Sequence, residues 1–335
     1  MANLTQFGND LYTGKRSVDF VGRRRLWYSI AGVLMALSIA LPFIGGGFNF
    51  GIEFRGGSQF QISGVQAADG GEIDDQLAVD TVQSLEPDDV TRVTVVGDDG
   101  LRVQTGQLDD DNTRAVASAL ATAYGVDEAD VTSSFIGPSW GADITGQALR
   151  GLVVFIALAA IVMALYFRTW KMAVAALASL AHDLVITAGV YAATGFEITP
   201  AAVIGFLTIL GFSLYDTVVV FDKIRENTSE LGEESRSTFG QAVNLAVNQT
   251  LVRSINTGVV AALPVAAILF IGAFVLGADT LRDISLALLV GIIVGTYSTI
   301  FIAAPLYAQL REREPAIRRA DERALEARAR AALVA

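Results

Sequence analysis

The chain has 335 residues, 52% of them hydrophobic and 18% charged, with a net charge of −11 and a mean hydropathy of +0.48. The apolar residues gather in long runs, which is typical of a membrane protein and not of one large soluble domain. There is no cysteine and only one histidine, His182, which excludes disulfides, thiolate catalysis and metal sites built from Cys or from several His.

The net charge is distributed unevenly along the chain. Residues 48–143 contain 18 Asp and Glu against 4 Arg, a net charge of −14, whereas the remaining residues carry a net charge of +3. An acidic block of this kind repels a phosphate backbone, so the composition excludes nucleic acid as its partner.

Six stretches are long enough to cross a bilayer as helices, which takes roughly 20 apolar residues each. They are residues 27–44, 147–167, 172–194, 200–221, 256–277 and 284–307. The first stretch follows Arg23, Arg24 and Arg25 and shows no small-residue cleavage site, which predicts a retained signal anchor.

Lys and Arg mark one side of these spans. They are concentrated in residues 1–26, in the tight loop at 168–171, in the loop 222–255 and in the tail 308–335. This distribution predicts a multi-pass protein of the cell membrane with both termini in the cytoplasm and residues 48–143 outside. The tail from residue 311 alternates Arg and Glu with Ala and Leu, which predicts a solvated helix.

The sequence of the acidic block predicts a small folded domain. The hydrophobic pattern predicts, in order, a strand at 58–63, a helix at 72–85, strands at 91–96 and 101–105, a helix at 111–124 and a strand at 130–136. Gly97, Asp98, Asp99 and Gly100 indicate a hairpin between the two middle strands. The order β-α-β-β-α-β predicts an α+β ferredoxin-like domain.

Asp216 is the strongest candidate for function. It lies in an apolar run six residues before Asp222, roughly 9 Å inside the membrane at 1.5 Å per residue. A carboxylate inside hydrocarbon costs about 2.5–3.5 kcal/mol and is usually functional. The next span runs antiparallel and places Arg253 at a similar depth, so the two residues form a candidate proton relay. Two other interpretations of these residues are a static ion pair and an Arg253 side chain that extends only to the membrane–water interface.

Other polar residues inside the spans carry weaker signals. His182 titrates near neutrality and could pass protons, but a satisfied polar group between helices explains it equally well. Asp183 beside it is ionisable and within the same span. Asn256 and Thr257 suit hydrogen bonds between helices. There is no Walker motif, nucleophile–base arrangement or metal-ligand spacing, so we expect neither covalent catalysis nor a cofactor.

The spans and their flanks resemble the SecF family, the smaller subunits of the SecDF complexes that assist bacterial and archaeal protein export. The resemblance rests on the ordered motifs GIEFRGGS, HDLVITAG, GFSLYDTVVVFDKIREN, NQTLVRSINTG and LALLVGIIVGTYSTIFIAAPL. The N-terminal LYTGKRSVDFVGRRR resembles the actinobacterial type. The match extends over nearly the whole chain.

This resemblance implies a resistance–nodulation–division architecture in which a SecD-like subunit supplies a second set of six spans. It implies use of the proton gradient, or of sodium in some organisms, to help unfolded preproteins leave the SecYEG channel, with further small translocon subunits and membrane lipids as neighbours. The family's ion path falls on Asp216 and Arg253. Tyr215 stands where many members have Asn and could still donate a hydrogen bond to Asp216, with a different local geometry. Two alternatives are half of a small-molecule or lipid exporter and a scaffold subunit without coupling.

Overall fold

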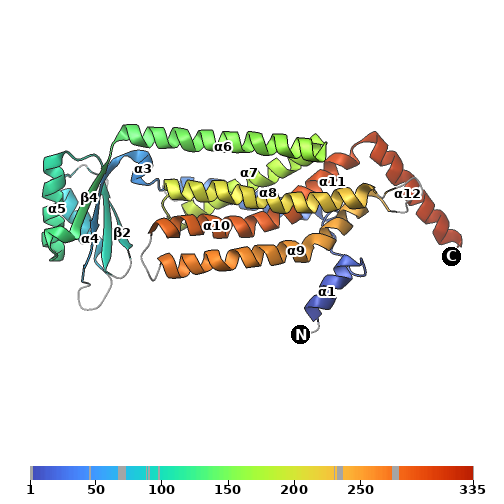
Figure 1. The fold of residues 1–335 in the computed structure, drawn as a ribbon, viewed down its shortest axis with the longest axis horizontal. Coiled ribbons are helices and arrows are strands. Elements are labelled where there is room, and N and C mark those ends of the chain that lie inside the picture. The colour runs from blue at the N-terminus through green and yellow to red at the C-terminus, as the bar shows by residue number, and fades with distance from the viewer. Residues whose placement is uncertain are drawn as a thin grey trace.

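The computed structural model describes residues 3–44, 47–66, 73–87, 89, 91–96, 99–229, 231, 237–273 and 279–334. They form a long bundle of helices with a small sheet domain at one end and the chain termini toward the other (Figure 1). The predicted helix start at Glu72, the hairpin residues Gly97 and Asp98, and the end of the expected fifth span at 274–277 lie outside the described residues.

Six helical segments are long and apolar enough to cross a membrane, which confirms the six predicted spans. They are α2 (Arg24–Ile44), α6 (Pro138–Phe167), α7 (Trp170–Thr194), α8 (Pro200–Ser229), α9 (Phe239–Ala267) with the π-helical η3 (Ile268–Ala273), and α10 (Asp279–Ser298) continuing through the π-helical η4 (Thr299–Ala303) into α11 (Ala304–Glu312). One end of the bundle carries Arg24, Arg25 and Arg313 and is the arginine-rich end. Two further helices, α1 (Asn3–Tyr12) and α12 (Pro315–Val334), lie beyond it. The chain is a polytopic helical membrane protein.

The segment 222–255, expected as a cytoplasmic loop, is largely helical. The helix α8 continues to Ser229, and α9 begins at Phe239 behind a capping box in which Thr238 and Gln241 satisfy each other's backbone N–H groups. Both extensions are amphipathic, and their apolar sides are buried, for example at Ile224 and Val243. Mean hydropathy detects the apolar part of a helix and misses such polar-faced extensions.

Small residues bring α8 and α10 into direct contact. A Cβ atom added at Gly291 would meet the side chain of Ile209, with Ile209 Cβ at 2.8 Å, and one added at Gly295 would lie 3.0 Å from Ser213 Cβ. The small-residue face of α10 therefore allows close backbone approach, as such faces do between membrane helices.

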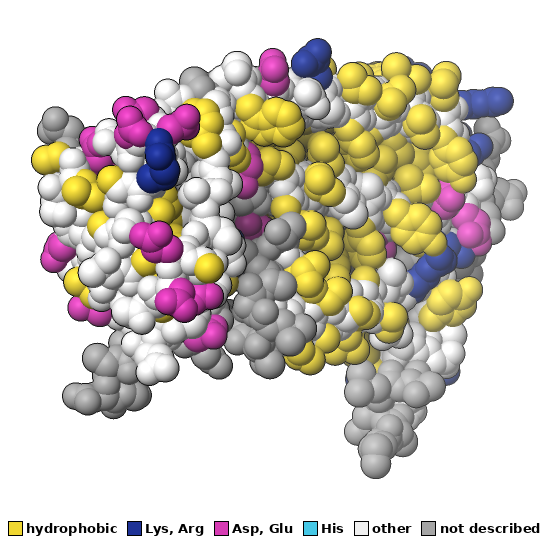
Figure 2. Space-filling model, turned by 60° about the vertical axis from the view of Figure 1, so that its left-hand side comes forward, with side chains coloured by type: hydrophobic (Ala, Val, Ile, Leu, Met, Phe, Trp, Pro, Cys, Tyr) yellow, Lys and Arg dark blue, Asp and Glu magenta, His cyan; other side chains and the backbone are white. Residues whose placement is uncertain are grey.

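The helices differ in how much of their surface the chain itself covers. In the most apolar 18-residue window, 56% of α7 is buried against only 11% of α2, 11% of α6 and 17% of α9 with η3. Figure 2 shows hydrophobic side chains spread over the bundle and acidic ones gathered on the sheet domain. Lipid or another membrane subunit must cover the apolar faces of α2, α6 and α9.

The sheet domain contains the elements β1 (Gly57–Ile62), α4 (Asp75–Leu85), β2 (Arg92–Val96), β3 (Gly100–Thr105), α5 (Asp110–Tyr124), the short η2 (Glu128–Asp130) and β4 (Val131–Ile136). The strand order is β2-β3-β1-β4, and every pair is antiparallel. The helices pack against the sheet around Phe60, Ile62, Leu101 and Val103, which are fully buried. The predicted order of strands and helices is therefore present, with bounds within three residues of those expected.

Two connections join the sheet domain to the bundle. The helix α6 starts at Pro138, two residues after β4 ends, and runs the length of the bundle (Figure 1). The turn between α7 and α8 forms the other connection, because Ile198 pairs with Phe50 in an isolated β-bridge. Beside it, Gln104 Nε2 of β3 donates a hydrogen bond to Glu197 Oε2 at 3.1 Å. The short α3 (Ile52–Arg55) precedes β1 at this junction.

Candidate functional site

Asp216 is buried inside the bundle, with 5% of the residue exposed. Its Oδ1 atom accepts a hydrogen bond from the Ser254 hydroxyl of α9 at 2.9 Å. Its Oδ2 atom is also buried and has no hydrogen-bond partner among the described residues. A carboxylate that is half satisfied in an apolar interior costs free energy, so packing stability alone does not explain its presence.

Arg253 lies at the predicted depth but forms no ion pair with Asp216. Its neighbour Ser254 contacts Asp216, so the two helices match in level. Successive residues of an α-helix are about 100° apart around the axis, so Arg253 projects to one side of this contact, and its side chain is exposed. Both residues are described, and no ion pair joins them in this conformation.

A second carboxylate, Asp183 of α7, lies next to this site and is better satisfied. Its Oδ2 atom accepts a hydrogen bond of 2.6 Å from Ser213, and its Oδ1 atom lies 3.2 Å from His182 Nδ1. Ser213 is one helical turn before Asp216 on α8, so it connects the surroundings of the two carboxylates. Polar groups of α7, α8 and α9 thus form one buried cluster across the bundle, consisting of His182, Asp183, Ser213, Asp216 and Ser254.

The remaining predicted site residues lie outside this cluster. Tyr215 is 57% exposed and faces away from the bundle interior, so it does not donate the possible hydrogen bond to Asp216, which Ser254 makes instead. Asn256 is exposed and Thr257 is half-buried. Ser213 and Ser254 were not predicted, since a serine in an apolar helix has no distinguishing sequence signal. Their only signals are spacings: Ser213 is three residues from Asp216, and Ser254 is adjacent to Arg253.

Among the described residues, no three His, Asp or Glu side chains are grouped so that they could hold a metal ion. Asp216 has one carboxylate oxygen without a partner among the described residues. This buried Oδ2 atom is available as an acceptor.

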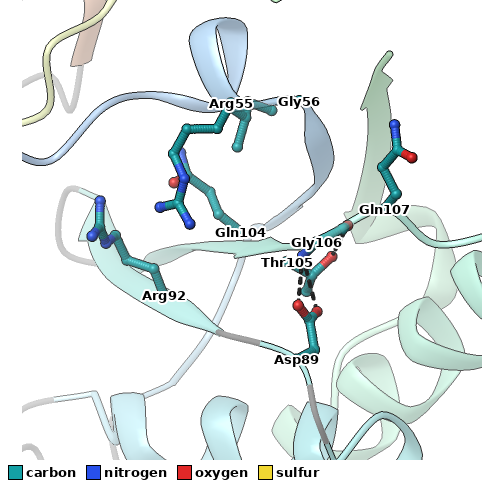
Figure 3. A pocket seen from close by; sticks show the side chains of 9 residues that line it. Arg55, Gly56, Asp89, Arg92, Gln104, Thr105, Gly106 and Gln107 are labelled. Atoms are coloured by element: carbon teal, nitrogen blue, oxygen red, sulfur yellow. Dashed lines mark hydrogen bonds between the residues drawn. The ribbon is translucent and has the colours of Figure 1, made fainter. Parts of the chain in front are cut away.

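A second polar site lies at the junction of the sheet domain and α3 (Figure 3). Arg55 and Arg92 border a cavity of about 300 Å³ that also includes Gly56, while Asp89 accepts hydrogen bonds from the Gly106 N–H at 2.8 and 3.0 Å. Gly57, at φ 142°, has no room for a side chain because a Cβ atom there would collide with the Thr105 carbonyl oxygen. The paired glycines therefore shape the entry of the chain into the sheet.

Six membrane-spanning helices, a buried carboxylate site and a small sheet domain define a membrane transport subunit. Comparison with known families agrees with this class. Residues 116–313 match the family described as protein export membrane protein SecD/SecF, C-terminal, and residues 43–68 match the SecD/SecF GG motif.

Individual relatives narrow the assignment. The chain is 42% identical to a protein translocase subunit SecF of Streptomyces coelicolor, covering 99% of this chain and 87% of the relative, and 42% identical to that of Mycobacterium leprae, covering 95% and 69%. The crystal structure of SecDF from Thermus thermophilus superposes with a TM-score of 0.74 at 29% identity, covering 89% of this chain and 39% of that one. The chain therefore belongs to the SecD/SecF family as a SecF-type translocase subunit, a transport component of the cell membrane.

Proposed function

We propose that this chain pairs with a SecD-like subunit and uses a transmembrane proton gradient, or a sodium gradient, to promote export of unfolded preproteins through a SecYEG channel. The chain corresponds to 39% of a SecDF chain, so the partner would supply the second set of spans. The sparsely covered apolar faces of α2, α6 and α9 support such a partner. Further small translocon subunits would bind around this pair, and no step requires covalent chemistry by this chain.

Asp216 is the ion-binding group in this proposal. The main observation in support of this role is its buried Oδ2 atom, which has no partner among the described residues. In the present conformation Ser254 stabilises the carboxyl group. A partial rotation of α9 about its axis would replace Ser254 with Arg253, and an opposite charge nearby favours the ionised carboxylate. The two conformations then bind protons differently, so a gradient shifts their equilibrium. A potential of 100 mV contributes about 2.3 kcal/mol per charge moved across the membrane.

The test is the variant Asp216→Asn in vesicles that contain the SecD-like partner and the channel. It keeps the shape of the side chain and removes titration, so gradient-dependent stimulation of export should be lost while the complex still assembles. The matched control is Asp222→Asn, six residues further along the same helix, which should export normally. Full response of Asp216→Asn to an imposed gradient would refute the relay, whereas loss of assembly would favour a scaffold.

The topology is part of the same proposal. The termini and the connection between α8 and α9 face the cytoplasm, and the domain at 48–143 is extracytoplasmic and ferredoxin-like. Support comes from the Lys and Arg distribution and from the antiparallel strand order β2-β3-β1-β4 within a β-α-β-β-α-β chain. The chain has no cysteine, so Asp99→Cys should react with an impermeant maleimide on intact cells, and Arg319→Cys only after lysis. The reverse labelling pattern of the two variants would show that the topology is inverted.

A further inference from the structure

A cavity of about 510 Å³ opens at the arginine-rich end of the bundle, where the start of α2 meets α11 and the beginning of α12. Four arginines border it, together with a tyrosine and a glutamate: Arg24, Arg25, Arg313, Arg318, Tyr28 and Glu312. These residues come from the two ends of the sequence and meet only in the folded chain.

The positive charge in this cavity exceeds the negative charge. Glu312 is engaged by Arg24, with Nη1 and Oε2 at 2.6 Å. The side chains of Arg25, Arg313 and Arg318 border the cavity, and these residues are exposed; their guanidinium groups make no hydrogen bond or ion pair with the described residues. The Tyr28 hydroxyl is buried and also has no hydrogen-bond partner in the described part of the chain. The free groups here include several strong donors, which suits an anion with several acceptor oxygens.

The position of the cavity identifies what kind of anion it would meet. Arg25 and Tyr28 lie in the first turns of α2, where the chain enters the membrane. On the side of Tyr28, the same helix continues through Gly32, Ala36 and Ile39, which are small or apolar and exposed. A ligand bound at the arginines would therefore have its charged group at the membrane surface and room for an apolar tail along α2.

We propose that this cavity binds the phosphate headgroup of an anionic phospholipid, with Arg25, Arg313, Arg318 and Tyr28 as its ligands. A guanidinium group matches phosphate oxygens in a bidentate geometry, and basic pockets at membrane-helix ends suit such headgroups. The inference depends on the six-span architecture and not on the export proposal. Binding would tie the start of α12 to α2 through the lipid.

The test uses the full chain in a neutral detergent and counts bound lipids by native mass spectrometry. Phosphatidylglycerol should bind in preference to phosphatidylcholine of the same chain length. The triple variant Arg25→Gln, Arg313→Gln, Arg318→Gln should weaken phosphatidylglycerol binding by roughly tenfold or more. The matched triple Arg23→Gln, Arg319→Gln, Arg328→Gln removes equal charge from the same segments outside the cavity and should stay within about twofold.

A single uncharged variant separates a built site from general attraction. Tyr28→Phe leaves the net charge unchanged and should still weaken binding severalfold without lowering the thermal unfolding temperature. Equal loss in both triple variants, or no preference for phosphatidylglycerol, would overturn the proposal in favour of diffuse attraction. Glycerophosphoglycerol, the same headgroup without acyl chains, should bind far more weakly. If it binds as tightly as the lipid, the site serves a soluble anion and the proposal is wrong.

Discussion

The middle of the bundle and its arginine-rich end differ in how their buried or partly buried charged side chains are paired. At the end, the partly buried charges are paired: Arg24 with Glu312 at 2.6 Å, and Lys171 with Glu314 at 2.7 Å. In the middle, Asp216 Oδ2 and His182 Nε2 are buried without partners among the described residues. Unsatisfied buried groups are costly, so a site that retains them is suited to binding something transiently.

Two amides of α9 hold the N-terminal segment in place. Asn248 of α9 is 1% exposed, yet its Oδ1 atom accepts from the Val18 N–H at 2.8 Å and its Nδ2 atom donates to the Val18 carbonyl at 2.9 Å. Asn244 holds Phe20 in a similar way, at 2.8 Å. These amides fasten the N-terminal segment to α9 and have no free hydrogen-bonding capacity, so their role is structural.

The largest expected effect on stability is at the close contact between α8 and α10, which supports the middle region. Gly291→Ala should lower the free energy of unfolding by about 2 kcal/mol or more, because its Cβ atom would overlap Ile209. Thermal unfolding in detergent measures the change. Gly211→Ala is the control: nothing lies within 4 Å of its added Cβ atom, so it should stabilise the helix by about 0.5–1 kcal/mol. Equal effects of the two variants would contradict the contact.

The two carboxylates in the middle should respond differently to loss of charge. Asp183→Asn disrupts contacts to Ser213 and His182 and should cost about 2 kcal/mol of stability. Asp216→Asn neutralises a half-satisfied buried group and should leave the unfolding temperature unchanged or higher. The same thermal assay compares them. A larger loss in Asp216→Asn would show that Asp216 is a structural residue.

A smaller, pH-dependent effect is expected at the end of the bundle. Partial burial opposes ionisation of Glu314, but hydrogen bonds and charge from Lys171 and Arg311 outweigh it and lower its pKa below 4.5. A lowered folded-state pKa stabilises the fold above the unfolded value and is lost as pH falls through the folded value. Glu314→Gln should therefore cost about 1 kcal/mol or less near pH 7, and the cost should shrink as the pH falls through the folded-state pKa. The exposed Glu322→Gln is the control, and a loss that stays the same at acid pH would refute the assignment.

The sequence predicted the depth of residues in the membrane better than their direction around a helix. Counting residues from Asp222 placed Asp216 and Arg253 at one level, and the Ser254 contact agrees with that level. Direction depends on how each helix is rotated against its neighbours, which is decided by packing such as that of Gly291 on Ile209. Tyr215 and Arg253 were therefore assigned to the interior although both side chains are exposed.

The sheet domain was predictable for a different reason. Its strands alternate apolar and polar residues, and its helices begin at residues that cap them, as Asp74 does through hydrogen bonds from the Gln76 and Leu77 N–H groups. These signals are local in sequence. The hydrogen bond between Gln104 and Glu197 joins residues 93 positions apart, so no local sequence pattern predicts it.

The shape of α6 has a mechanical consequence. Its 30 residues form a stiff rod about 45 Å long at 1.5 Å per residue, with the sheet domain attached at one end. Tilting such a rod by about 5° at the far end moves the attached end by about 4 Å, more than the length of a hydrogen bond. Because the turn at 195–199 holds the other side of the sheet domain, this displacement becomes a rotation about that turn. Small motions within the bundle are thereby amplified outside it.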